Sequence, residues 1–126
     1  MEITLNHTIV PSHNHVASAR FYARIFGFEF VKEWGHFAVV RVNSTLVLDF
    51  AVKEHFSSSH YAFKVRDLQF DEIHHRLSAE KLVFGSGPSS TDDGEINHDH
   101  GGRGLYFEDP NGHVLEVLTK DYVLDD

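Results

Sequence analysis

The hydrophobic pattern of this chain predicts the same order of elements twice: a strand, a helix and then three more strands. Apolar residues at helical spacing predict a first helix over 16–26 that ends at Gly27, and a second helix that begins near Asp67. Strands are predicted over 2–10, 28–31, 37–42, 45–52, 59–65, 82–84, 105–107 and 113–119. A repeat of about 50–60 residues indicates two paired units, because one such unit cannot bury its apolar face alone.

Local signals set the expected ends of several elements. Pro11 is expected to end the first strand, and Ser12 or Asn14 to cap the helix that follows. Asp67 is expected to cap the second helix. Residues 34–36, which include a glycine, are expected to form a turn between two strands.

The two copies also predict how the chain is organised. We expect a single α+β domain over 1–126, built from a first βαβββ module over 1–54 and a second over 57–122. The polar stretch 85–102 lengthens the second copy and is expected to be a loop. Two such copies can place their mixed sheets side by side and curl them into a cleft, where a site would form.

Charge and composition exclude several classes of protein. The formal net charge of −8 argues against nucleic-acid binding, which needs a basic surface. No stretch approaches the roughly 18 apolar residues of a membrane-spanning helix. The first residues show no signal-peptide pattern, so a cytoplasmic location is expected. The chain has 11 histidines and no cysteine, which favours a metal bound through nitrogen and oxygen.

Candidate ligands occupy matching positions in the two copies. His7 and His60 lie on the first strand of each copy, and Asp49 and Glu116 lie on the last strand. Imidazole nitrogens and carboxylate oxygens suit Zn²⁺, Fe²⁺, Mn²⁺, Ni²⁺ or Co²⁺, and two histidines with one carboxylate leave coordination positions open. A single histidine on a strand is more often structural, so the hypothesis depends on this joint placement and on Glu116, which needs a partner inside an apolar strand.

Several segments resemble the vicinal oxygen chelate superfamily, the group of glyoxalases, bleomycin-resistance proteins and extradiol dioxygenases. They are 5–7 (LNH), 18–28 (SARFYARIFGF) and 106–116 (YFEDPNGHVLE). The resemblance implies paired βαβββ modules, a divalent metal in the cleft and the ligands His7, His60 and Glu116. It also implies a homodimer with exchanged modules, in which His7 of one chain serves a site with the second module of the other chain.

The resemblance leaves the subfamily open. Small glyoxalase I enzymes use a glutamate as a fourth metal ligand where this chain has the shorter Asp49. Asp49 would bind the metal or contact one of its ligands. In a glyoxalase of this kind, Glu116 or Asp49 would be the base that abstracts the substrate proton. Fosfomycin thiol transferases use three such ligands and a tyrosine matching Tyr106, but have a threonine where this chain has Ile9. Extradiol dioxygenases use two histidines and a glutamate with Fe²⁺. Bleomycin-binding members lack the metal ligands, so the intact set argues against that role.

The expected function is that of a metal-dependent enzyme, glyoxalase-like (a lyase) or dioxygenase-like, acting on a small oxygenated substrate that chelates the metal. Glu116 and Tyr106 would be catalytic, and Tyr106 and Arg103 would orient the substrate. The alternatives are a thiol transferase of the fosfomycin-resistance type, a non-catalytic drug-binding protein and a dimerisation domain without a site. The stretch 92–100 would be either a lid or a mobile, solvated loop.

Overall fold

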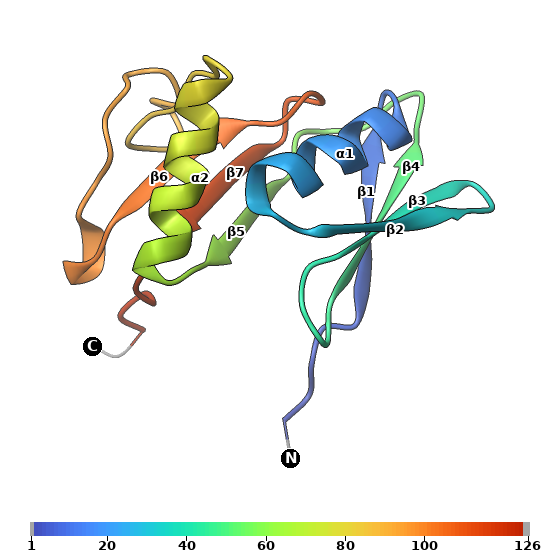
Figure 1. The fold of residues 1–126 in the computed structure, drawn as a ribbon, viewed down its shortest axis with the longest axis horizontal. Helices are drawn as coiled ribbons and strands as arrows, with labels where there is room; N and C mark the ends of the chain where they lie inside the picture. The colour runs from blue at the N-terminus through green and yellow to red at the C-terminus, as the bar shows by residue number, and fades with distance from the viewer. Residues whose placement is uncertain (1, 125–126) are drawn as a thin grey trace. The chain divides into compact units, whose positions relative to one another are not determined.

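A computed structural model describes residues 2–124, which form two compact units whose boundary falls between Ser57 and Ser58. The first unit contains one helix and a four-stranded mixed sheet, and the second contains one long helix and a three-stranded mixed sheet (Figure 1). The α+β class expected from the sequence is confirmed. No helix within residues 2–124 combines the length and apolar character needed to cross a membrane.

The first unit runs β1, α1, β2, β3 and β4 along the chain. These elements are β1 (His7–Ser12), α1 (His15–Phe26), β2 (Glu29–Trp34), β3 (Phe37–Arg41) and β4 (Val47–Val52). The strands lie in the order β1-β4-β3-β2, with β1 parallel to β4 and the other neighbours antiparallel. Asn14 caps α1 by accepting a hydrogen bond from the Ala17 amide at 3.0 Å, and Gly27 ends the helix at a left-handed φ of 81°.

The second unit contains β5 (His60–Lys64), α2 (Asp67–Ala79), a short 3₁₀ turn η1 (Asp99–Gly101), β6 (Gly104–Glu108) and β7 (Val114–Leu118). Its strands lie in the order β5-β7-β6, with β5 parallel and β6 antiparallel to β7. The strand expected over 82–84 is absent from this sheet. Only an isolated bridge between Gly85 and Tyr106 marks its place, and the chain passes from there into the loop.

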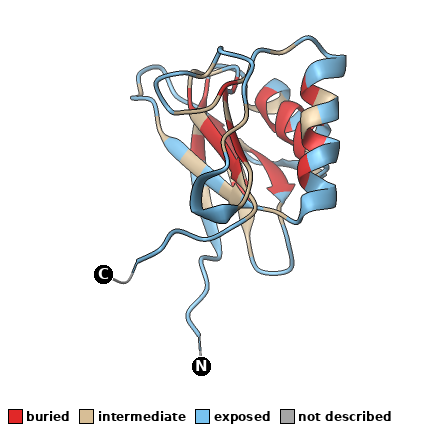
Figure 2. Cartoon of the chain, turned by 90° about the vertical axis from the view of Figure 1, so that its left-hand side faces the viewer, coloured by how far each residue is buried: buried red, intermediate tan, exposed pale blue. Residues whose placement is uncertain are grey.

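Each unit buries its helix against one face of its own sheet. In the first unit, Tyr22 of α1 packs edge-on against Phe50 of β4, with ring centres 4.7 Å apart and both residues fully buried. In the second unit, the buried apolar residues of α2 and of the sheet are Phe70, Ile73, Leu77, Leu105, Phe107, Leu115 and Val117. In Figure 2 the buried segments, drawn in red, lie on the strands and along part of each helix. The opposite face of each sheet remains available for a site.

Three expected boundaries were wrong, each for a local reason. The first strand begins at His7 and continues through Pro11, because β1 is an edge strand, where the missing proline N–H is tolerated. Arg66 is the residue that caps α2, and its amide donates to the Gln69 side chain at 2.9 Å, while Asp67 is the first helical residue. Trp34 ends β2, and only residues 35–36 form the turn.

Candidate functional site

His60 and Glu116 meet on the open face of the second sheet. Glu116 lies two residues beyond Val114, the register partner of His60, so the two side chains lie on the same face. The Nε2 atom of His60 lies 3.1 Å from Oε1 of Glu116, and their side chains are 46% and 7% exposed. The strand pairing therefore brings together one histidine and one carboxylate that the sequence had placed far apart.

The hydrogen bonds of His60 decide which of its nitrogens is available. Its Nδ1 lies 3.0 Å from the carbonyl oxygen of Val114. Because a carbonyl oxygen only accepts, Nδ1 carries a proton in this bond. In the neutral imidazole Nε2 then presents its lone pair toward Glu116, and in the doubly protonated ring Nε2 donates a hydrogen bond to Glu116. Two lone-pair groups 3.1 Å apart repel unless a proton or a cation lies between them. This is also the arrangement that fixes metal-binding histidines in proteins.

Tyr106 completes this cluster from the neighbouring strand. It lies directly opposite Glu116 in the β6–β7 register, and its ring stacks near that of His60, with centres 6.1 Å apart and planes at 17°. Burial, and then the charge and hydrogen bonding of Glu116, raises the pKa of Tyr106 to about 12. The phenol therefore keeps its proton at neutral pH and acts as a hydrogen-bond donor beside the carboxylate.

The turn before β7 anchors the start of β5. His113 is fully buried, and its Nδ1 accepts a hydrogen bond from the amide of Ser59 at 3.0 Å. Asp109 holds the turn by accepting from the amides of Asn111 at 2.8 Å and His113 at 2.9 Å. Because Ser59 directly precedes His60, these contacts fix the backbone that carries the histidine.

The first unit repeats this arrangement at the same register positions. His7 pairs with Val47, and Asp49 lies two residues further along β4, as Glu116 lies beyond Val114. The Nδ1 atom of His7 lies 2.7 Å from Oδ1 of Asn6, an oxygen that only accepts, so Nε2 carries the lone pair in the neutral ring, as in His60. The match of His7 with His60, and of Asp49 with Glu116, is thus present in the strand pairing.

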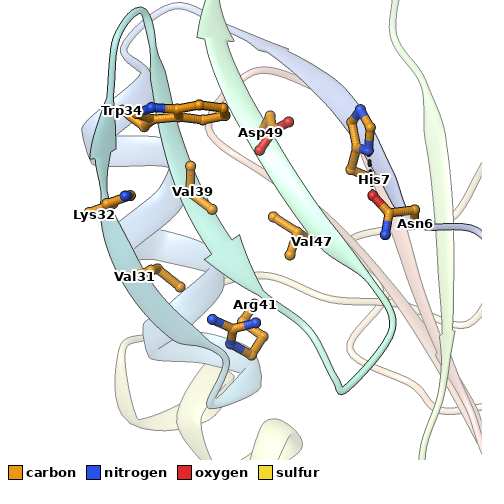
Figure 3. Close-up of a pocket in the computed structure, with 9 residues that line it drawn as sticks. All are labelled: Asn6, His7, Val31, Lys32, Trp34, Val39, Arg41, Val47 and Asp49. Carbon is orange, nitrogen blue, oxygen red and sulfur yellow. Dashed lines mark hydrogen bonds between the residues drawn. The ribbon is translucent and has the colours of Figure 1, made fainter.

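An open hollow of about 570 Å³ lies on the same face of the first sheet. Figure 3 shows the side chains that line it, which come from β1 with the residue before it, β2, β3 and β4. They are Asn6, His7, Val31, Lys32, Trp34, Val39, Arg41, Val47 and Asp49. The hollow thus combines apolar side chains with a histidine, a carboxylate and two cations, a lining that suits a small molecule.

Arg103 lies away from this chemistry. Its guanidinium donates to the carboxylate of Asp71 at 2.7 Å and to that of Asp67 at 3.0 and 3.2 Å, and it lies over the ring of Phe70. The hydrogen bond to Asp71, followed by the bond and charge of Asp67, raises the pKa of Arg103. Arg103 therefore links the start of β6 to the first turn of α2.

The polar loop is tied down at several points. Asp93 accepts hydrogen bonds from the side chain and the amide of Ser86 at 2.5 and 3.0 Å. The bond from the Ser86 hydroxyl, followed by the bond from the Glu95 amide, lowers the pKa of Asp93. Asn97 pairs with Gly104 as an isolated bridge. These contacts give the loop a defined course from Gly85 to β6.

The structure thus groups the expected site residues by unit. His60, Tyr106 and Glu116 lie together in the second unit, and His7 and Asp49 line the hollow of the first. Among residues 2–124, no three His, Asp or Glu side chains form a group that could hold a metal. Asn6, Trp34 and His113 were not predicted as site residues. The sequence offered a signal for Asn6 alone, through the adjacent His7.

Comparison with known proteins gives consistent results. A family model described as "Glyoxalase/Bleomycin resistance protein/Dioxygenase superfamily" matches residues 4–117. The solved structures of the oxidases ChaP-H2 and ChaP-H1 are similar, with TM-scores of 0.92 and 0.90 and identities of 45% and 44%. The alignments cover 97% of this chain and 97% of ChaP-H2, and 96% of this chain and 98% of ChaP-H1.

A third relative has a different activity in its name. The metallothiol transferase FosB of Lysinibacillus sphaericus (strain C3-41) is 24% identical over 122 residues, which cover 92% of this chain and 82% of that protein. Its alignment therefore also extends over both units.

Proposed function

Because the chain belongs to the glyoxalase, bleomycin-resistance and dioxygenase superfamily, we propose that it is a divalent-metal-dependent enzyme that oxidises a small oxygenated substrate with dioxygen. The metal ligands are His7, His60 and Glu116. The observation that carries the proposal is the 3.1 Å contact between Nε2 of His60 and the buried Glu116 carboxylate. Oxidation is favoured over the other reactions of the superfamily because the ChaP oxidases share 44–45% of their residues with this chain.

The donor set fits this assignment. Both histidines engage Nδ1 with an oxygen acceptor, which leaves Nε2 as the nitrogen that can bind a cation. Two histidines and one carboxylate with open positions are typical of non-haem Fe²⁺ oxygenases, while Zn²⁺, Mn²⁺, Ni²⁺ and Co²⁺ also accept such ligands. When bound, the metal would supply Lewis-acid and redox chemistry at the positions left open by the protein.

The remaining side chains have separate roles in the proposal. Tyr106 keeps its proton and donates a hydrogen bond to Glu116 or to a substrate oxygen, which orients both. Asp49, the register equivalent of Glu116, accepts a proton from the substrate or serves as a further ligand. Arg103 is left out of the substrate site, because its guanidinium is bonded to Asp67 and Asp71.

The proposal also includes a homodimer with exchanged modules. Within residues 2–124 neither unit holds three potential ligands of its own, so a complete set needs both kinds of unit. These units can belong to one chain or to two copies of it. A dimer with exchanged modules supplies His7 from one copy and the pair His60 and Glu116 from the other.

The test is dioxygen consumption by untagged protein loaded anaerobically with Fe²⁺. We expect uptake with at least one member of a panel of catechols and hydroxynaphthoates, and loss of that uptake in His60→Ala and Glu116→Gln. Asp121→Asn, an exposed carboxylate of the second unit, is the matched control. Uptake that persists in both ligand variants would contradict the proposal.

A second candidate is thiol transfer, which the similarity to the metallothiol transferase FosB favours. The resemblance to fosfomycin thiol transferases includes the three proposed ligands and Tyr106. Those enzymes have a threonine where this chain has Ile9. The same protein loaded with Mn²⁺ and given fosfomycin with L-cysteine distinguishes the two reactions. Formation of a cysteine–fosfomycin adduct, with no dioxygen uptake on the panel, would support thiol transfer over oxidation.

A further inference from the structure

A register shift in β2 changes the direction of its last side chains. Phe30 pairs with Val40, which faces the helix, but Lys32 pairs with Val39, which faces the hollow, so the shift falls at Val31. In a regular strand, residues 30, 32 and 34 would share one face. The irregularity instead turns Lys32 and Trp34 into the hollow beside Val31. Bulges of this kind often re-aim side chains next to functional sites.

The re-aimed Trp34 presents a large apolar ring to solvent. It is 63% exposed, although it lies in an ordered strand and lines the hollow. The apolar side chains of Val31, Val39 and Val47 line the hollow with it (Figure 3). An indole ring with apolar side chains beside it offers a stacking surface to a flat aromatic ring.

Lys32 is the cation that the hollow presents beside Trp34. Lys32 and Arg41 bring two positive charges to the lining, against the carboxylate of Asp49 in the lining and that of Glu29, which pairs with Arg41 from outside it. The Lys32 ammonium lies 5.9 Å from the centre of the Trp34 ring, so a ring stacked there would have a cation near it. Arg41 donates from Nε to Glu29 at 3.1 Å while it lines the hollow.

We propose that the hollow of the first unit binds an aromatic small molecule that carries a negative charge, with Trp34 stacking on its ring and Lys32 and Arg41 attracting its anionic group. The identification of this molecule as the substrate rests on the proposed function. His7 and Asp49 line the same hollow, so a ligand stacked on Trp34 would lie in the same hollow as one proposed metal ligand.

The experiment measures binding of 1-hydroxy-2-naphthoate to the full chain in the presence of EDTA. Trp34 is the only tryptophan of the chain, so its fluorescence reports binding to the wild type. Titration calorimetry gives the affinities of the variants. Two further probes separate the contributions: 1-naphthol is aromatic but uncharged at pH 7.5, and cyclohexanecarboxylate is anionic without an aromatic ring.

We expect Trp34→Leu to weaken naphthoate binding by about tenfold or more. Lys32→Gln and Arg41→Gln should each weaken it by roughly three- to tenfold and leave 1-naphthol binding unchanged. The matched controls are Val52→Ala and Lys53→Gln, exposed residues of the first unit that do not line the hollow. Both should bind as the wild type does.

Three results would overturn the inference: no naphthoate binding at millimolar concentration, wild-type affinity in Trp34→Leu, or equal affinity for naphthoate and cyclohexanecarboxylate. Failure of the proposed function is a separate result, because these titrations need no metal. Naphthoate binding that depends on Trp34, in a protein that never binds a metal, would contradict the proposed function and support this ligand site.

Discussion

Replacement of Arg103 by alanine tests whether this residue supports the fold or binds substrate. The guanidinium makes ion pairs with Asp67 and Asp71 at 3.0 and 2.7 Å and lies 4.4 Å from the centre of the Phe70 ring, with 26% of the side chain exposed. Because both aspartates are largely exposed, each ion pair contributes only about 0.5 kcal/mol to stability. The cation–π contact adds about 0.5–1 kcal/mol, and the packed side-chain stem adds a similar amount.

We therefore expect Arg103→Ala to lower the free energy of unfolding by about 2 kcal/mol. In a urea titration, the unfolding midpoint would fall by about 1 M, since the slope for a chain of this size is about 2 kcal/mol/M. Arg103→Lys keeps the charge but loses the forked geometry, so it should lose about half as much. Arg76→Ala is the matched control, because its pair with Glu72 lies on the helix surface and contributes about 0.5 kcal/mol or less.

The opposite result would restore the role expected from the sequence. If Arg103→Ala unfolds at the wild-type midpoint but loses turnover or ligand affinity, then Arg103 binds substrate and the structural interpretation is wrong. A double-mutant cycle with Asp71→Asn isolates the shorter ion pair, and a coupling energy near zero would count against the proposed link to α2.

Three further predictions concern the second unit and the assembly. Tyr106 should titrate near pH 12 rather than 10 in the folded protein. Because the unfolded chain loses this proton first, the free energy of unfolding should fall as pH rises from 10 to 12. In a spectrophotometric titration, the Tyr106→Phe protein should lack the ionisation step near pH 12. His113→Leu removes the acceptor of the Ser59 amide, so it should destabilise the protein by about 2 kcal/mol and weaken metal binding about tenfold or more. Unchanged metal affinity would refute the claim that His113 positions His60. If modules are exchanged between two copies, mixing the inactive His7→Ala and Glu116→Gln proteins should restore activity, because each hybrid dimer has one intact site. No recovery after verified subunit exchange would argue against the module-exchanged dimer.

The sequence predicted the elements whose signals are local. The caps at Asn14 and Gly27 and the buried positions of α1 follow from side-chain chemistry and helical spacing, and both were confirmed. The repeat matched His7 with His60 and Asp49 with Glu116, and these pairs occupy equivalent register positions in the two sheets. The caps and these register positions could be predicted because neighbouring residues or a repeated pattern determine them, whereas the role of the four residues as metal ligands stays a prediction.

Other features depend on contacts that no local pattern reveals. The bulge at Val31 reverses the face of Trp34, yet a β-branched valine carries no turn signal. Residues 82–84 have the composition of a strand but form no ladder, and the isolated bridge of Gly85 with Tyr106 is the pairing that follows them. Arg103 looked like a free cation until the fold placed two aspartates of α2 beside it.

The most direct test of the central claim is the binding of Co²⁺, whose visible absorption reports its ligands, to untagged, metal-free protein. The account predicts one ion per chain, with affinity reduced about tenfold or more in each of His7→Ala, His60→Ala and Glu116→Gln and kept in Asp121→Asn. Wild-type affinity and an unchanged spectrum in the His60→Ala and Glu116→Gln proteins would contradict it.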